Sequence, residues 1–310
     1  MSSSEGSRRA IIAAFFANLG IALSKLVAFF FTGAASMLAE AIHSLADTGN
    51  QGLLMLGGKK ANQEPDEKHP FGHGRERYFW AFVVALVIFS VGAVFAIFEG
   101  IDKLIHPHEP ESIGIAIGVL AVAIVLESFS LRTAVVETRH VKPAGESYWH
   151  FIRHTKSAEL PVVLLEDLGA LIGLLFALIG VVLADVTHKG EYDAMGSIAI
   201  GVLLAVIALI LVFRMKSLLI GESADSVTRQ ALDDAILAGN DIRSIIHMRT
   251  LQMGPEDILV AAKVEMASSI GYPQMAAAID AAELRMRAAV PDARVIYLEP
   301  DVRYDVLPDS

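Results

Sequence analysis

The chain has 310 residues and a formal net charge of −10, and 54% of its residues are hydrophobic against 19% charged. This composition is too apolar for an ordinary soluble domain and indicates a membrane protein with several spans. Because there is no cysteine, disulfides and thiolate metal ligands are excluded, and any metal would be held by His, Asp, Glu, Asn or backbone oxygens. No basic patch interleaved with aromatic residues occurs, which argues against a nucleic-acid-binding protein.

The first expected membrane span covers residues 10–32 and follows a cytoplasmic polar head, residues 1–9. The apolar stretch is longer than 20 residues and lacks the short apolar core and cleavage site of a signal peptide, so we expect it to be retained. Lys25 lies inside this span. We expect its side chain to snorkel toward the surface or to pair with an acid.

The second apolar stretch, residues 35–58, carries polar groups in a place where a membrane span tolerates them poorly. Four of them, spaced by three, four and three residues, share one face of the expected helix: Glu40, His43, Asp47 and Asn50. Ionisable side chains inside a bilayer usually face a cavity, a partner or a substrate. His43 and Asp47 can reach one ion, and an imidazole with a carboxylate suits Zn²⁺ or a similar transition metal. The stretch favours a metal transporter over a soluble buried helix whose polar face meets water.

The loop that follows, residues 59–77, holds a second candidate metal site. Asp66, His69 and His73 have the pattern D-x-x-H-x-x-x-H, which can wrap three ligands around one tetrahedral ion. Proline and glycine residues in the same stretch indicate turns and not a long helix. The alternative is a solvated connector with basic residues.

Four further spans are expected, at residues 78–105, 112–131, 160–184 and 193–213. The fourth carries Glu127 near its end, and the fifth carries Glu166 and Asp167 about a third of the way along. In the fifth span, Gly169 and Gly173 form a GxxxG step that would let a neighbouring helix approach closely.

Lysine and arginine are concentrated in alternate loops. The loops at residues 59–77 and 132–159 hold five each, whereas the loops on the opposite side hold none or one. Since basic residues favour the cytoplasmic side, six spans with both termini in the cytoplasm fit this distribution. We expect residues 132–159 to be a long solvated loop, although its scattered histidines could also collect metal.

From residue 215 to residue 310 the chain becomes polar and acidic. A helical pattern over residues 222–243, two alternating strands, a helix over residues 272–290 and a last strand predict a small cytoplasmic α+β domain. Phosphate-binding loops and Rossmann glycine patterns are missing from the sequence, so transport would draw on an ion gradient or a separate partner.

Together these features resemble the cation diffusion facilitator family. The resemblance is carried by TGAASMLAEAIHSLADTGNQ in the second span, by HPFGHGRERY in the next loop, and by the C-terminal domain. The fifth-span sequence VVLLEDLGALIG resembles the sequences of the family branch that includes the ninth mammalian zinc transporter. The resemblance implies a homodimer that exports divalent metal in exchange for protons, with a ferredoxin-like cytoplasmic domain joining the subunits.

The resemblance also implies a central site with two residues from the second span and two from the fifth. These correspond to His43 and Asp47, and to Asp167 as the second fifth-span member. The first fifth-span member is Val163, which cannot bind metal. A water molecule could complete the site, or one of three side chains: Glu166, Glu127 and Asn50.

The family's loop site corresponds to Asp66, His69 and His73. Its C-terminal binuclear site uses several histidines, and here that domain has only His247, with Asp301 as a further candidate, so we expect that site to be absent or reduced.

The chemistry of these residues favours Zn²⁺ as the transported ion, with Mn²⁺, Fe²⁺ and Co²⁺ as alternatives because a nitrogen ligand is missing. Metal and protons would compete for the same groups, which gives antiport by alternating access. A non-transporting metal sensor or scaffold is the other hypothesis, and an enzyme is disfavoured because no nucleophile or substrate pocket is visible. With no transit peptide in view, we expect a bacterial inner membrane.

Overall fold

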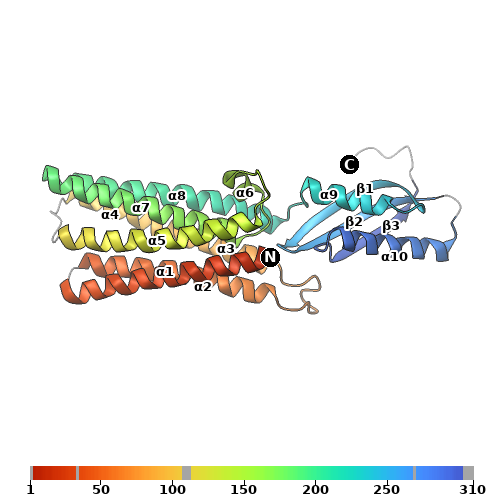
Figure 1. The fold of residues 1–310 in the computed structure, drawn as a ribbon, viewed down its shortest axis with the longest axis horizontal. Helices are drawn as coiled ribbons and strands as arrows, with labels where there is room; N and C mark the ends of the chain where they lie inside the picture. The colour runs from red at the N-terminus through yellow and green to blue at the C-terminus, as the bar shows by residue number, and fades with distance from the viewer. Residues whose placement is uncertain (1–2, 33–34, 107–112, 268–269, 303–310) are drawn as a thin grey trace. The chain divides into compact units, whose positions relative to one another are not determined.

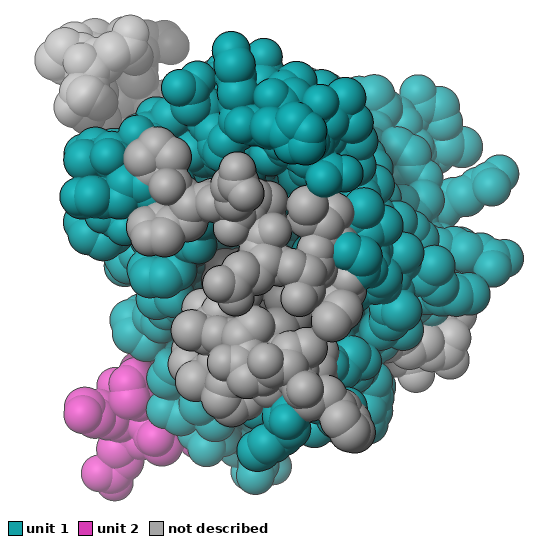
Figure 2. Space-filling view, turned by 90° about the vertical axis from the view of Figure 1, so that its left-hand side faces the viewer, with its two compact units in different colours: residues 1–64, 75–219 teal, residues 65–74, 220–310 magenta. Residues whose placement is uncertain are grey.

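The computed structural model describes residues 3–32, 35–106, 113–267 and 270–302 (Figure 1). Its helices and strands are, in chain order, α1 (Ser3–Thr32), α2 (Ala35–Ala61), α3 (Glu76–Val87), the π-helical η1 (Ile88–Ala93), α4 (Val94–Ile105), α5 (Ile113–Val141), α6 (Tyr148–His154), α7 (Glu159–Thr187), α8 (Glu191–Ile220), α9 (Ser226–Leu237), β1 (Ile242–Gly254), β2 (Asp257–Met266), α10 (Tyr272–Ala289) and β3 (Val295–Asp301). The chain divides into two compact units, coloured separately in Figure 2. Unit 1 is Met1–Glu64 with Arg75–Leu219, and unit 2 is Pro65–Gly74 with Ile220–Ser310.

Unit 1 is a bundle of long helices. The last residues of α1, α4 and α7 lie at one end of the bundle, and the end of α2 and the helix α6 lie at the other (Figure 1). Five stretches of the described chain are long and apolar enough to cross a membrane: Ala10–Val27, Glu76–Ile105, Ala116–Val141, Glu159–Thr187 and Glu191–Ile220. The helix α2 is not one of these five, and its apolar sequence is interrupted by the polar residues noted above. The sixth span therefore stays a prediction.

The segment between the fourth and fifth predicted spans is more helical than expected. The prediction of a loop over residues 132–159 is wrong, because α5 continues to Val141 and the short helix α6 follows. Hydropathy marks where a helix leaves an apolar environment, whereas the helix itself continues through residues of good helix propensity. The N-cap of α6 is Ser147, whose hydroxyl accepts a hydrogen bond from the backbone N–H of His150 at 3.1 Å.

Glycines let helices of unit 1 touch along their backbones. A Cβ atom built on Gly201 of α8 would lie 2.8 Å from the backbone nitrogen of Ile97 in α4, closer than real Cβ atoms come. A Cβ atom on Gly169 of α7 would lie 2.4 Å from Cδ1 of Ile207 in α8. At Gly169 the neighbour is therefore the end of a side chain of α8, and the close approach of a helix backbone at the Gly169–Gly173 step stays a prediction.

Unit 2 contains the C-terminal α+β fold in the predicted order of elements. Its sheet has the order β1-β2-β3, with β1 and β2 antiparallel and β2 and β3 parallel. Alternate residues of β2, from Ile258 to Val264, are buried with side chains of α9 and α10 in one core. The first helix is shorter than predicted: α9 ends at Leu237, just before Gly239, and β1 begins at Ile242.

Candidate functional site

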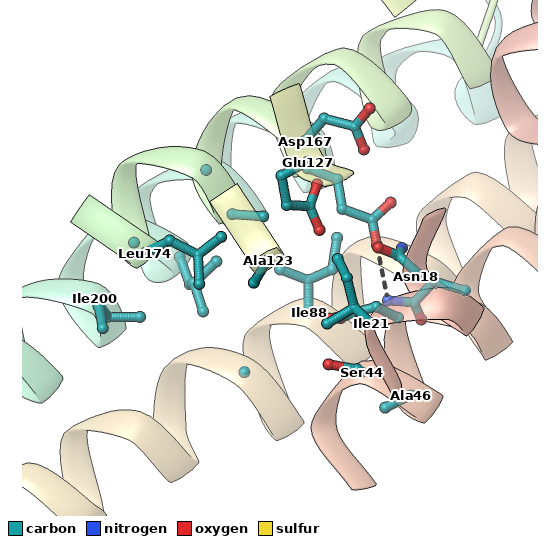
Figure 3. Close-up of a pocket in the computed structure, with 18 of the residues that line it drawn as sticks. Asn18, Ile21, Ser44, Ala46, Ile88, Ala123, Glu127, Asp167, Leu174 and Ile200 are labelled. Atoms are coloured by element: carbon teal, nitrogen blue, oxygen red, sulfur yellow. Dashed lines mark hydrogen bonds between the residues drawn. The ribbon is translucent and has the colours of Figure 1, made fainter. Parts of the chain in front are cut away.

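A cavity of about 160 Å³ lies inside unit 1 (Figure 3). Residues of α1, α2, α5, α7 and α8 and of the segment around η1 form its walls. The walls are mostly apolar, but four carboxylates lie among them: Asp47, Glu127, Glu166 and Asp167. A π-helical turn beside such a cavity is a common feature of functional sites.

The helix α2 supplies Asp47 and Asn50, which both line the cavity. Their spacing of three residues places them on the same helix face, as the sequence predicted. The side chains of Glu40 and His43 lie outside the described residues. The backbone of α2 nonetheless puts His43 one turn from Asp47.

The helix α7 supplies two adjacent acids with different surroundings. Asp167 is 1% exposed and accepts a hydrogen bond from the hydroxyl of Ser130 in α5 at 2.7 Å. Glu166 accepts two hydrogen bonds from amides of α2, at 3.2 Å from Asn50 Nδ2 and at 2.6 Å from Gln51 Nε2. Ser130 and Gln51 were not identified from the sequence, because only ionisable residues and Asn50 were considered as candidates. Helical spacing was the available signal, since Ser130 stands three residues after Glu127 and Gln51 stands four residues after Asp47.

Glu127 of α5 is 5% exposed and lies beside Asp167 on one side of the cavity (Figure 3). Its Oε2 atom has no hydrogen-bond partner among the described residues, and the same holds for Oδ1 of Asn50. Leaving a buried polar atom unpaired costs about 1–3 kcal/mol. Two such oxygens beside one cavity are the arrangement that a bound cation would satisfy.

Lys25 of α1 also lines the cavity and is 5% exposed. Its ammonium donates a hydrogen bond to the hydroxyl of Ser44 in α2 at 3.0 Å. The sequence left two options for this lysine, and its burial excludes snorkelling to the surface of unit 1.

Val163 lies one turn before Asp167 and is fully buried in the apolar core of unit 1. It is not among the residues that line the cavity. The position at which the family resemblance implies a ligand therefore takes part in packing here.

The loop residues Asp66, His69 and His73 come together in unit 2. Their potential ligand atoms all lie within 4.8 Å of one another. Asp66 Oδ1 lies 3.3 Å from His69 Nδ1, and Asp66 Oδ2 lies 3.3 Å from His73 Nε2. The backbone N–H of His69 donates to Asp66 at 2.6 Å, which lowers the pKa of that carboxyl and keeps it ionised for a cation.

Glycine fixes the end of this loop against the sheet. A Cβ atom on Gly74 would lie 2.8 Å from the carbonyl oxygen of Met253, and one on Gly254 would lie 3.0 Å from Cα of Gly74. A side chain at position 74 does not fit this contact, and one at position 254 would be tight, so the close approach attaches the loop to the turn between β1 and β2.

Comparison with known proteins assigns the chain to a family. The family model of the cation efflux transmembrane domain matches residues 11–220. The chain belongs to the cation efflux, or cation diffusion facilitator, family. It is therefore an integral membrane protein of a transporter family and not an enzyme, as the sequence predicted.

Several curated relatives are similar to this chain. The proton-coupled zinc antiporter SLC30A9 of Mus musculus, a mitochondrial protein, is 34% identical over 242 residues, which is 78% of this chain and 43% of the relative. Metal tolerance protein C4 of Arabidopsis thaliana is 26% identical over 260 residues, 84% of this chain and 57% of the relative. The cation-efflux pump FieF of Cronobacter sakazakii is 26% identical over 251 residues, which is 80% of this chain and 77% of the relative. The matched part of this chain spans less than half the length of SLC30A9.

Proposed function

We propose that this protein exports a divalent transition-metal ion, Zn²⁺ in the first place, by proton antiport with alternating access. The observation that carries the proposal is the cavity inside unit 1, where carboxylates from α2, α5 and α7 converge. Buried acids that face a cavity in a membrane protein mark an ion pathway. The similar SLC30A9 proteins are named proton-coupled zinc antiporters, which supports Zn²⁺ as the ion and protons as the coupled ion.

The ligands of the transported ion are His43, Asp47, Asp167 and Glu127. Of the three side chains that could replace Val163, Glu127 has the strongest support. Its Oε2 is buried and unpartnered among the described residues, unlike the oxygens of Glu166, and it is a carboxylate, unlike the neutral amide of Asn50. One nitrogen and three oxygen donors then form a four-coordinate site, which Zn²⁺ accepts.

Glu166 has a different role in this proposal. Both of its carboxylate oxygens accept hydrogen bonds from the amides of Asn50 and Gln51. These bonds tie α7 to α2 and orient Asn50, so that the unpartnered Oδ1 of Asn50 is available as an additional oxygen for the ion.

Proton coupling follows from the chemistry of the ligands. Metal binding requires a neutral imidazole and ionised carboxylates, so each bound ion displaces protons from the same atoms. In the inward-facing state the ion binds from the cytoplasm. In the outward-facing state protons replace it and are carried back, without ATP.

The identity of the ion depends on this donor set. With one imidazole, the site favours Zn²⁺ over the hard ions Mg²⁺ and Ca²⁺. Because the other donors are oxygens, Mn²⁺, Fe²⁺ and Co²⁺ are the alternatives that an assay has to rank.

Further elements of the proposal concern the whole chain. Residues 10–214 form six spans, with the head at residues 1–9 and residues 215–310 on the cytoplasmic side of a membrane, in the simplest case a bacterial inner membrane. The C-terminal domain joins two copies into a homodimer. Asp66, His69 and His73 form a second, cytoplasmic metal site.

The test is metal uptake into proteoliposomes with an imposed pH gradient, comparing Zn²⁺, Mn²⁺, Fe²⁺ and Co²⁺. We expect gradient-driven uptake that Asp47→Asn and Asp167→Asn each abolish. Asp185→Asn is the matched control, because Asp185 lies on α7 but is exposed and outside the cavity. Uptake that persists in both cavity variants, or that is absent for all four ions in folded wild-type protein, would refute the proposal.

A further inference from the structure

The cavity contains a positive charge that the proposed transport chemistry does not use. Among the described residues that line it, Lys25 is the single basic side chain, facing four carboxylates. It comes from α1, a helix that contributes none of the proposed ligands.

A buried ammonium is costly unless opposite charge compensates it. The hydroxyl of Ser44 accepts one hydrogen bond from Lys25 but carries no charge. The nearest source of opposite charge on these walls is the set of four cavity acids, and the charge of Lys25 acts on one of them, Glu127. A lysine ammonium is also a compact charge on a flexible stem, which can be displaced without moving the helix backbone.

We infer that Lys25 is a resident cation of the transport site, which balances the cavity carboxylates when no metal is bound and is displaced from them by the entering ion. This inference rests on the proposed function. Lys25 binds no metal itself, so it is a positioning residue that sets how tightly the site holds its ion.

The expected consequence is a limit on affinity. A divalent ion that enters must compete with the ammonium for the same carboxylate oxygens, and both charges are positive. Removing the ammonium should therefore make metal bind more tightly and leave more slowly. For an exporter, slow release lowers the maximal rate while the Michaelis constant for metal also falls.

The test measures Zn²⁺ affinity by competition with a chromophoric chelator, using the full chain in detergent and a background of His69→Ala and His73→Ala that removes the loop site. Lys25→Met removes the charge and the donor. Lys25→Gln removes the charge but keeps an N–H donor for Ser44, and Lys25→Arg keeps the charge. We expect Met and Gln to tighten Zn²⁺ binding by about tenfold, with Arg close to the wild-type affinity.

The outcomes distinguish a role of the Lys25 charge from a role in packing or hydrogen bonding. If Lys25 serves packing or hydrogen bonding alone, Lys25→Gln retains the wild-type affinity, and the inference is overturned. Unchanged or weaker binding in both uncharged variants also overturns it, and if Lys25→Met does not fold, Lys25→Gln decides. The proposed function is tested separately in the His69→Ala/His73→Ala protein with Lys25 intact. If Asp47→Asn removes no Zn²⁺ binding from that protein, the cavity is not a metal site and the proposed function itself fails.

Discussion

Glu166 and Asp167 on α7 and Glu127 on α5 differ in their hydrogen-bond partners, and this difference is the basis for the roles proposed for them. Both carboxylate oxygens of Glu166 accept amide hydrogen bonds, whereas Oε2 of Glu127 has no partner among the described residues. A sequence reader sees three equivalent acids. The hydrogen bonds between helices distinguish them.

Glu127→Gln is expected to weaken Zn²⁺ binding in the background without the loop site by at least roughly tenfold to a hundredfold, because loss of a ligand should cost no less than loss of an outer-shell partner, which costs that much. The variant keeps the shape of the side chain and removes a charged donor oxygen. Glu166→Gln should have a smaller effect, because in the proposed site Glu166 orients Asn50 and does not bind the ion. Chelator competition on both variants checks this, and an equal or larger loss at Glu166 would reverse the assignment.

The candidate site could be predicted from the sequence only where its residues share one helix. Asp47 and Asn50 follow from a spacing of three on α2, and Asp66, His69 and His73 follow from a short loop pattern. The contacts of Ser130 and Gln51 and the burial of Lys25 result from the packing of α1, α2, α5 and α7 against one another. Periodicity within one helix carries no information about that contact.

At the scale of elements, helix ends depend on local chemistry that hydropathy does not report. The prediction of a loop over residues 132–159 failed for this reason, while the start of α9 is fixed by a cap. Asp225 accepts hydrogen bonds from the backbone N–H of Thr228 at 2.9 Å and from its hydroxyl at 2.7 Å. These bonds outweigh partial burial and lower the pKa of Asp225 below 3.8.

Asp225→Ala should destabilise α9 by about 1 kcal/mol at pH 7. Because the folded-state pKa is lowered, the carboxylate's contribution is present above the unfolded pKa and is lost as pH falls through the folded pKa. The difference between wild type and Asp225→Ala should therefore shrink below about pH 4. Amide hydrogen exchange of residues 226–237, compared between the two proteins at each pH, measures it.

Asp225→Asn is the matched control for the cap. Asparagine caps helices about as well as aspartate, so this variant should keep the stability of α9 without the change below pH 4. A pH-dependent loss of the same size in Asp225→Asn would mean that another group causes it.

The contact of α4 with α8 makes a second prediction for elements. Gly201→Ala places a methyl group 2.5 Å from Cγ1 of Ile97 and 2.8 Å from its backbone nitrogen. The two helices must separate, which should cost about 1–3 kcal/mol. The measurement is the midpoint of heat-induced loss of monodisperse protein in detergent. Gly118→Ala on α5 is the control, because a Cβ atom there meets nothing within 4 Å, and it should leave the midpoint unchanged or raise it.

At the scale of the whole molecule, the two candidate metal sites belong to different compact units. The cavity lies within unit 1, and the cluster of Asp66, His69 and His73 lies within unit 2. The broad fold could be predicted from the sequence, because long apolar helices and an alternating strand pattern are local features. The inclusion of Pro65–Gly74 in unit 2 could not, since it depends on two glycines far apart in the chain, Gly74 and Gly254.

Metal bound at the two sites should accordingly stabilise the two units independently of each other. A ligand at a hundred times its dissociation constant adds about 2.7 kcal/mol to the state that binds it. Sites that share no partners contribute additively. We expect Zn²⁺ to slow amide hydrogen exchange around the cavity in His69→Ala/His73→Ala protein, and in residues 65–74 and the turn between β1 and β2 in Asp47→Asn protein.

The combined variant should show neither effect, and addition of a chelator should reverse both in the wild type. If the loop variant alone removed the Zn²⁺ protection around the cavity, the two sites would not be independent. Zn²⁺ at the loop site would then stabilise more than unit 2, to which the contact of Gly74 with Gly254 attaches the loop. The stabilisation by the two sites would not be additive.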